Sequence, residues 1–85
     1  MQDFLLIKGT VYHQRNGEKL PYVNVYNLSQ KTGVLSNENG FYQLENVQPD
    51  DSIRFSFVGF KTSTFTGLQL RSSTRVLLIP EFTEM

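Results

Sequence analysis

The chain has 85 residues, of which 39% are hydrophobic, 13% aromatic and 19% charged, and its eight basic and eight acidic side chains give a formal net charge of zero. This composition excludes a disordered chain, and the balanced charge argues against a nucleic-acid partner or an anionic membrane surface. A chain this short forms one small domain with little room for a deep catalytic cleft. With no cysteine and one histidine, it lacks thiol chemistry, disulfides and any site built on several imidazoles.

No apolar run approaches the roughly 20 residues that a membrane-spanning helix needs. The apolar run from Phe4 to Ile7 is also too short for the core of a signal peptide. We therefore expect no direct membrane insertion by this segment.

Apolar residues recur with a period of two in short runs, which predicts an all-β domain without a helix. In the first run Ile7, Gly9 and Val11 share one face of a strand, and Lys8, Thr10 and Tyr12 share the other. The Asn16-Gly17 pair then predicts a tight turn, because both residues tolerate positive φ.

The second run, after Pro21, alternates in the same way. Pro21 cannot donate a ladder hydrogen bond, so we expect it at a strand start or a sheet edge. The residues predicted to face inward are Val23 and Val25, and those predicted to face outward are Tyr22, Asn24 and Tyr26. A turn is expected at 30–33, before a short strand at 34–36.

The oxygen-rich stretch from Ser36 to Gly40 raises the question of a calcium site. It fails as a calcium loop, because the twelfth position counted from Ser36 is Val47 rather than glutamate. The stretch instead predicts a turn, in which Asn37 bonds the backbone two residues on and Asn39-Gly40 adopts positive φ.

Three features are predicted in the second half of the chain. Tyr42 and Leu44 should point inward from the strand that follows the turn, and Asp50-Asp51 should form a solvated turn. A central strand should then bury alternate residues, with a bulge or bend at Gly59 and a Thr-rich continuation. The inward residues expected of the last two principal strands are Ile53, Phe55, Phe57, Val76 and Leu78. About seven short strands favour a β-sandwich, with a small barrel as the alternative.

Four blocks of sequence carry a resemblance to a known family. They are IKGTV at 7–11, NGEKLPYVNV at 16–25, TGVLSNENGFY at 32–42 and IRFSFVGFKT at 53–62. In this order and spacing the chain resembles the carboxypeptidase-regulatory-like domain over residues 7–80. The resemblance implies a seven-stranded Greek-key β-sandwich of the transthyretin-like (prealbumin-like) type, in which the stretch at 36–40 is a hairpin turn. Tyr22 departs from the family, which usually has glycine after the proline.

The resemblance also implies a setting. Similar domains stand at the N-terminus of exported Gram-negative proteins, especially TonB-dependent outer-membrane nutrient receptors, where they lie on the periplasmic face of the outer membrane. We expect residues 1–85 to be a single domain cut from such a longer protein, because the chain starts at its first strand and stops soon after Pro80. Its expected role is non-catalytic, without cofactor or metal. Its expected partners are the rest of its parent polypeptide and periplasmic or outer-membrane proteins.

Two alternatives have candidate residues of their own. Outward-facing Tyr12, Tyr22 and Tyr26 would form an aromatic patch for a sugar or a protein if the first two strands were neighbours, which would make the domain a carbohydrate-binding module. His13 would be the centre of a hydrolase, although no nucleophile elbow accompanies it.

Overall fold

A computed structural model describes residues 4–81, so both ends of the predicted domain, 1–3 and 82–85, lie outside the described residues. Seven strands and one short helix make up this part of the chain. They are β1 (Leu5–His13), β2 (Asn24–Asn27), β3 (Thr32–Leu35), β4 (Phe41–Val47), β5 (Ser52–Ser56), β6 (Ser63–Thr66), α1 (Gly67–Arg71) and β7 (Arg75–Leu78).

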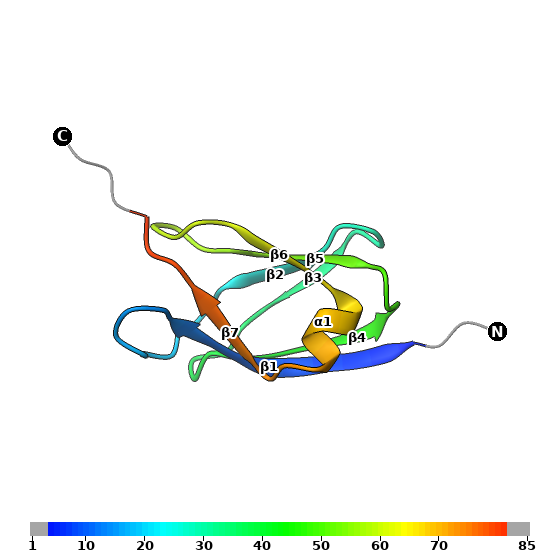
Figure 1. Cartoon of the computed structure of the whole chain (residues 1–85), viewed down its shortest axis with the longest axis horizontal. Coiled ribbons are helices and arrows are strands. Elements are labelled where there is room, and N and C mark those ends of the chain that lie inside the picture. The colour runs from blue at the N-terminus through cyan, green and yellow to red at the C-terminus, as the bar shows by residue number, and fades with distance from the viewer. Residues whose placement is uncertain (1–3, 82–85) are drawn as a thin grey trace.

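The strands form two stacked sheets, which confirms the predicted seven-stranded β-sandwich (Figure 1). One sheet has the order β4-β1-β7, and the other has the order β3-β2-β5-β6. All pairs are antiparallel except β1 and β7, which run parallel. The strand β1 therefore lies at the centre of its sheet, with β4 and β7 on either side.

Most residues of the core between the sheets are ones that the period of two predicted to face inward; Leu20, Val47 and Leu70 join them without such a prediction. Ile7 and Val11 of β1, Val25 of β2, and Val76 and Leu78 of β7 are all buried. The remaining buried hydrophobic residues are Leu20, Val23, Tyr42, Leu44, Val47, Ile53, Phe55 and Leu70. The alternation was sufficient because each strand has one face toward the other sheet and one toward solvent.

An aromatic chain crosses the core from one sheet to the other. The ring of Tyr42 meets Phe55 edge-to-face at 5.2 Å, and Phe55 meets Phe65 in the same manner at 5.7 Å. Burial raises the pKa of the Tyr42 phenol to about 12. The Tyr42 hydroxyl has no hydrogen-bond partner among residues 4–81, so this polar group has lost its water without a replacement.

The helix α1 corrects the prediction that the chain has no helix. It is only five residues long, and it joins β6 of one sheet to β7 of the other (Figure 1). A capping box starts it: Thr66 Oγ1 accepts from the backbone of Gln69, and Gln69 Oε1 accepts from the backbone of Thr66. One turn of helix buries only Gly67 and Leu70, which is too short a pattern to stand out from the surrounding strand-like composition.

The stretch from Ser36 to Gly40 forms the predicted turn, but it does not join a hairpin. It connects β3 of one sheet to β4 of the other, so it is a corner of the sandwich. Asn37 Oδ1 accepts from the backbone of Asn39 and of Phe41, each at 2.9 Å. Only Gly40 takes positive φ, at 78°, whereas Asn39 was also predicted to do so.

The turn at Asn16-Gly17 follows the same rule, with only the glycine at positive φ. It is closed by the backbone of His13, which donates to Glu18 and accepts from Gly17. The predicted bend at Gly59 is also present, with φ of 86° and a bond from the backbone of Phe60 to that of Phe57. Because β5 ends at Ser56, Phe57 lies in this bend and is half-buried rather than fully inward.

Tyr22 takes the left-handed backbone conformation, with φ of 61°. A backbone of this kind favours glycine, since a Cβ atom is disfavoured there. The backbone of Tyr22 is held by its bond to the carbonyl of Ser36, and the Ser36 hydroxyl accepts from Val23 and donates to Leu20. The surrounding bonds thus impose the conformation on a residue that does not favour it.

The backbone strain at Tyr22 can be measured with two variants. At an ordinary position Ala is more stable than Gly by about 0.5–1 kcal/mol. At Tyr22 we expect the reverse order, with Tyr22→Gly more stable than Tyr22→Ala by about 1 kcal/mol in urea unfolding, because only glycine adopts this φ without a steric cost. Equal stabilities, or the ordinary order, would contradict a strained Tyr22.

A second prediction concerns the unpartnered hydroxyl in the core. Tyr42→Phe removes that group and keeps the ring contacts, so we expect the free energy of unfolding to rise by about 1 kcal/mol. Tyr22→Phe is the matched control, since the side chain of Tyr22 is 58% exposed and its hydroxyl reaches water. A loss of stability specific to Tyr42→Phe would mean that the buried hydroxyl has a partner.

Candidate interaction site

The structure does not bring together the three tyrosines of the predicted aromatic patch. The patch required β1 and β2 to be neighbours, but they belong to different sheets. Tyr12 lies on the outer face of one sheet and Tyr26 on that of the other, and Tyr22 lies in the loop before β2. Three separate rings do not make the single stacking surface that the carbohydrate-binding interpretation required.

Tyr26 has its own local packing on the outer face of the four-stranded sheet. Its cross-strand partners are Gly33 and Arg54. A Cβ atom at Gly33 would lie 2.9 Å from Tyr26 Cδ1, so the missing side chain makes room for the ring. On the other side the Arg54 guanidinium lies over the ring at 5.6 Å. Tyr26 is therefore half-covered by its neighbours, as in ordinary cross-strand packing.

His13 is part of a turn rather than of a catalytic group. Its Nδ1 accepts from the backbone of Arg15 at 3.1 Å and of Asn16 at 3.4 Å, and its ring meets Phe60 edge-to-face at 5.1 Å. Within residues 4–81 no serine or threonine hydroxyl bonds to it. The Nδ1 lone pair is thus used to hold the turn and is not available as a base toward a nucleophile.

Asp51 is buried, which corrects the prediction of a solvated Asp50-Asp51 turn. Only 4% of Asp51 is exposed, whereas Asp50 lies at the surface. Its Oδ2 accepts three hydrogen bonds: from Asn27 Nδ2 at 2.9 Å, from Gln30 Nε2 at 2.7 Å and from the backbone of Gln48 at 2.9 Å. Sequence reasoning missed this cluster because its members are far apart in the chain and meet only after the strands pair.

The pKa of Asp51 reflects two opposing effects. Desolvation on burial raises the pKa of the carboxyl group, and the hydrogen bonds from Asn27, Gln48 and Gln30 lower it. The hydrogen bonds prevail, so the pKa lies below its ordinary value and the group remains a carboxylate. All the donors belong to this chain and converge on one oxygen, which is the arrangement of a structural anchor.

Groups of three or more metal-ligating side chains do not occur in the described part of the chain. The oxygen-rich turn at 36–40 uses Asn37 for its own backbone and Ser36 to hold the loop before β2. Among residues 4–81, no helix is long and apolar enough to cross a membrane.

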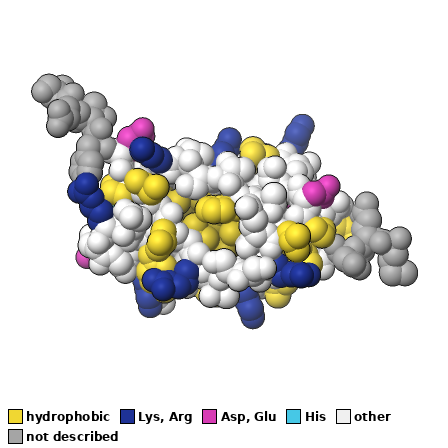
Figure 2. Space-filling view, viewed as in Figure 1, with side chains coloured by type: hydrophobic (Ala, Val, Ile, Leu, Met, Phe, Trp, Pro, Cys, Tyr) yellow, Lys and Arg dark blue, Asp and Glu magenta, His cyan; other side chains and the backbone are white. Residues whose placement is uncertain are grey.

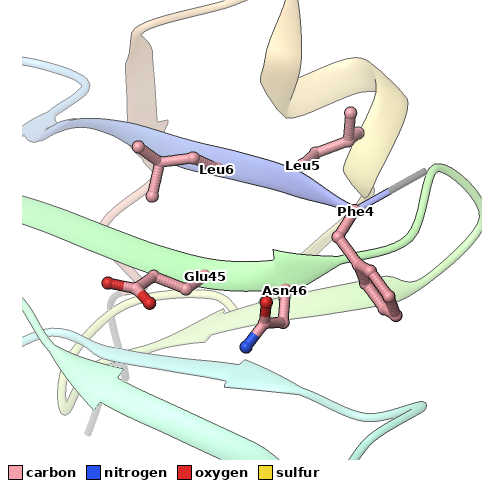
Figure 3. A pocket seen from close by; sticks show the side chains of 5 residues that line it. All are labelled: Phe4, Leu5, Leu6, Glu45 and Asn46. Atoms are coloured by element: carbon pink, nitrogen blue, oxygen red, sulfur yellow. The ribbon is translucent and has the colours of Figure 1, made fainter.

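A first surface hollow, of about 250 Å³, lies where β1 meets the end of β4. The pairing slips between Leu5 and Ile7, and Asn46 takes positive φ at this bulge. Figure 3 shows the side chain of Leu5 pointing toward the helix and those of Glu45 and Asn46 on the opposite side of the strand pair. Because these side chains point away from one another, they do not surround a ligand.

A second and larger hollow, of about 450 Å³, lies on the outer face of the three-stranded sheet. We call it the Thr10 depression, because Thr10 is a small residue at its centre with the larger Phe41 opposite on β4 and Arg75 opposite on β7. Its lining residues are Lys8, Gly9, Thr10, Tyr12, Phe41, Gln43, Thr74 and Arg75. Period-two alternation predicted that Lys8, Thr10 and Tyr12 share a face. It could not predict the pairing of β1 with β4 and β7, which brings the other lining residues beside them.

A comparison with protein families matches residues 7–80 to the CarboxypepD_reg-like domain. The chain belongs to this family. The match confirms the predicted family, and its Ig-like, transthyretin-like fold agrees with the two sheets described above. No curated protein and no solved structure shows significant similarity to the chain.

Family membership bears directly on the kind of site to expect. CarboxypepD_reg-like domains are non-catalytic accessory domains. Within the described residues, His13 caps a turn and Asp51 anchors loops. The Thr10 depression is the larger of the two hollows described above for this CarboxypepD_reg-like domain.

Asp51 gives a prediction with a defined dependence on pH. Because its folded pKa lies below the unfolded value, its contribution to stability is present above about pH 4 and is lost as the pH falls through the folded pKa. We expect Asp51→Asn to lower the free energy of unfolding at pH 7 by about 1.5–3 kcal/mol, the worth of hydrogen bonds to a charged group. Its stability should also fall less than that of the wild type between pH 5 and pH 2.

The neighbouring Asp50→Asn is the control for this measurement, since it removes the same charge from an exposed position. We expect it to change stability by less than about 0.5 kcal/mol. If both variants had the same effect at pH 7, or the same pH profile, the anchoring role of Asp51 would be wrong.

Proposed function

We propose that this domain is a non-catalytic interaction domain of a larger cell-envelope protein. Its setting in this proposal is the periplasmic face of the Gram-negative outer membrane, and its parent is a TonB-dependent nutrient receptor. The single observation behind the proposal is the family match over residues 7–80, since the family consists of accessory domains. The domain would act by contacts with the rest of its polypeptide and with periplasmic or outer-membrane proteins.

The distribution of charge supports a protein-binding role rather than a nucleic-acid one. The net charge is zero, and Figure 2 shows the Lys and Arg side chains spaced along the upper and lower margins, where the outer faces of the two sheets lie. Hydrophobic side chains occur between them in small separate groups. Nucleic-acid binding needs a concentrated basic patch.

The edges of the sheets offer a second means of contact. In the four-stranded sheet, which has the order β3-β2-β5-β6, the edge strands β3 and β6 have one pairing partner each. Each is four residues long, so a partner could add a short strand there through its backbone. Such contacts require no catalytic residue, and we propose that the domain is not an enzyme.

Deletion of this domain from its encoded full-length protein tests the proposal. We expect the deleted protein to reach and insert into the outer membrane, while nutrient uptake or recovery of its partner proteins falls several-fold. Tagged full-length protein is the control, and fractionation should place the domain on the periplasmic side. Unchanged uptake together with unchanged partner recovery, or a cytoplasmic location, would refute the proposal.

A further inference from the structure

The Thr10 depression has the form of a small binding site. Phe41, Thr10 and Arg75 lie side by side on three neighbouring strands, and Lys8 and Tyr12 precede and follow Thr10 on the same face of β1. A short side chain surrounded by four long ones leaves a concave surface on an otherwise level sheet. Its volume of about 450 Å³ lies within the range of small-ligand sites.

The charge in the depression is unbalanced. Lys8 and Arg75 supply two cations, and no carboxylate is among the lining residues. Neither cation forms an ion pair with another residue of 4–81. Lys8 and Arg75 are diagonal neighbours on β1 and β7, because Arg75 pairs with Thr10, two residues after Lys8, and such neighbours generally have Cα atoms roughly 8 Å apart. Two cations so placed can hold one acidic ligand from two sides.

The uncharged lining residues offer both stacking and hydrogen bonds. The Arg75 guanidinium lies 5.0 Å from the centre of the Tyr12 ring, so it is directed toward that ring. Phe41, on the strand β4 beyond Thr10, is 39% exposed. The Gln43 amide and the Thr10 and Thr74 hydroxyls make no hydrogen bond with other residues of the described chain. Rings beside free donors and acceptors suit a ligand whose carbon faces are apolar and whose edge carries hydroxyls.

We propose that the Thr10 depression binds a carboxylate-bearing saccharide. The pyranose ring would lie against the exposed ring of Phe41, its carboxylate would contact Lys8 and Arg75, and its hydroxyls would face Gln43 and the threonines. A neutral sugar would leave both cations without a counter-charge. A protein partner would need a wider surface, roughly 800 Å² on each side, than this bounded hollow presents. The proposal rests on this geometry alone and does not depend on the receptor assignment.

Titration of the isotope-labelled chain with trigalacturonate, followed by NMR, tests the proposal. We expect the backbone amides of residues 8–10, 43 and 74–75 to shift, with binding that weakens as salt rises. Lys8→Gln and Arg75→Gln should each lower affinity about fivefold, the effect of one exposed charge contact. Phe41→Ala should also weaken binding while leaving the salt dependence unchanged.

Matched controls separate this site from general charge attraction. Lys61→Gln removes an exposed cation outside the depression, so it should leave affinity unchanged. Neutral maltotriose should bind at least tenfold more weakly than trigalacturonate. The proposal fails if trigalacturonate causes no shifts, if Lys61→Gln weakens binding as much as Lys8→Gln, or if a glutamate-rich peptide binds the depression more tightly than the saccharide. These outcomes are independent of the deletion experiment.

Discussion

The arrangement of the two sheets depends on the hydrogen bonds that the buried carboxylate of Asp51 accepts. Through one oxygen this carboxylate binds Asn27 at the end of β2, Gln30 in the turn that follows, and the backbone of Gln48 just after β4. The backbone carbonyl of Asp51 accepts a hydrogen bond from the backbone N–H of Gly67 at the start of the helix α1. Segments from both sheets and from the crossover between them therefore converge on one residue. The buried charge is tolerable because the three hydrogen bonds to Oδ2 compensate its desolvation.

The opposite end of the sandwich is closed by contacts of a different kind. Phe60 packs against His13 and Phe57, and the backbone after β7 pairs with the β5–β6 bend, with Lys61 bonded to Ile79 and Glu81 to Gly59. Between the polar anchor and this aromatic closure, the rings of Tyr42, Phe55 and Phe65 fill the space between the sheets. With both ends closed and the interior filled, recognition is left to the outer faces and edges.

The sequence allowed prediction wherever the deciding contacts were local. Period-two alternation placed Val25, Tyr42 and Val76 in the core, because a strand exposes successive side chains to opposite faces. It could not show that Asp51 is buried, since an adjacent pair of acidic residues is typical of a surface turn and its donors come from as far as 24 residues away. Strand pairing is equally non-local. The sequence therefore could not show that β1 and β2 lie in different sheets, which separates the three tyrosines of the expected patch.

The same non-local pairing determines the chemistry of the outer face. Because β7 runs parallel to β1, with Arg75 beside Thr10 and Leu77 beside Tyr12, one register both buries Val76 and Leu78 and brings a guanidinium to the depression. A slip of one residue would turn Arg75 into the core and Val76 toward solvent, at a large cost in free energy. The hydrophobic core thus fixes the place of Arg75 on the outer face, because the register that buries Val76 and Leu78 also sets Arg75 beside Thr10.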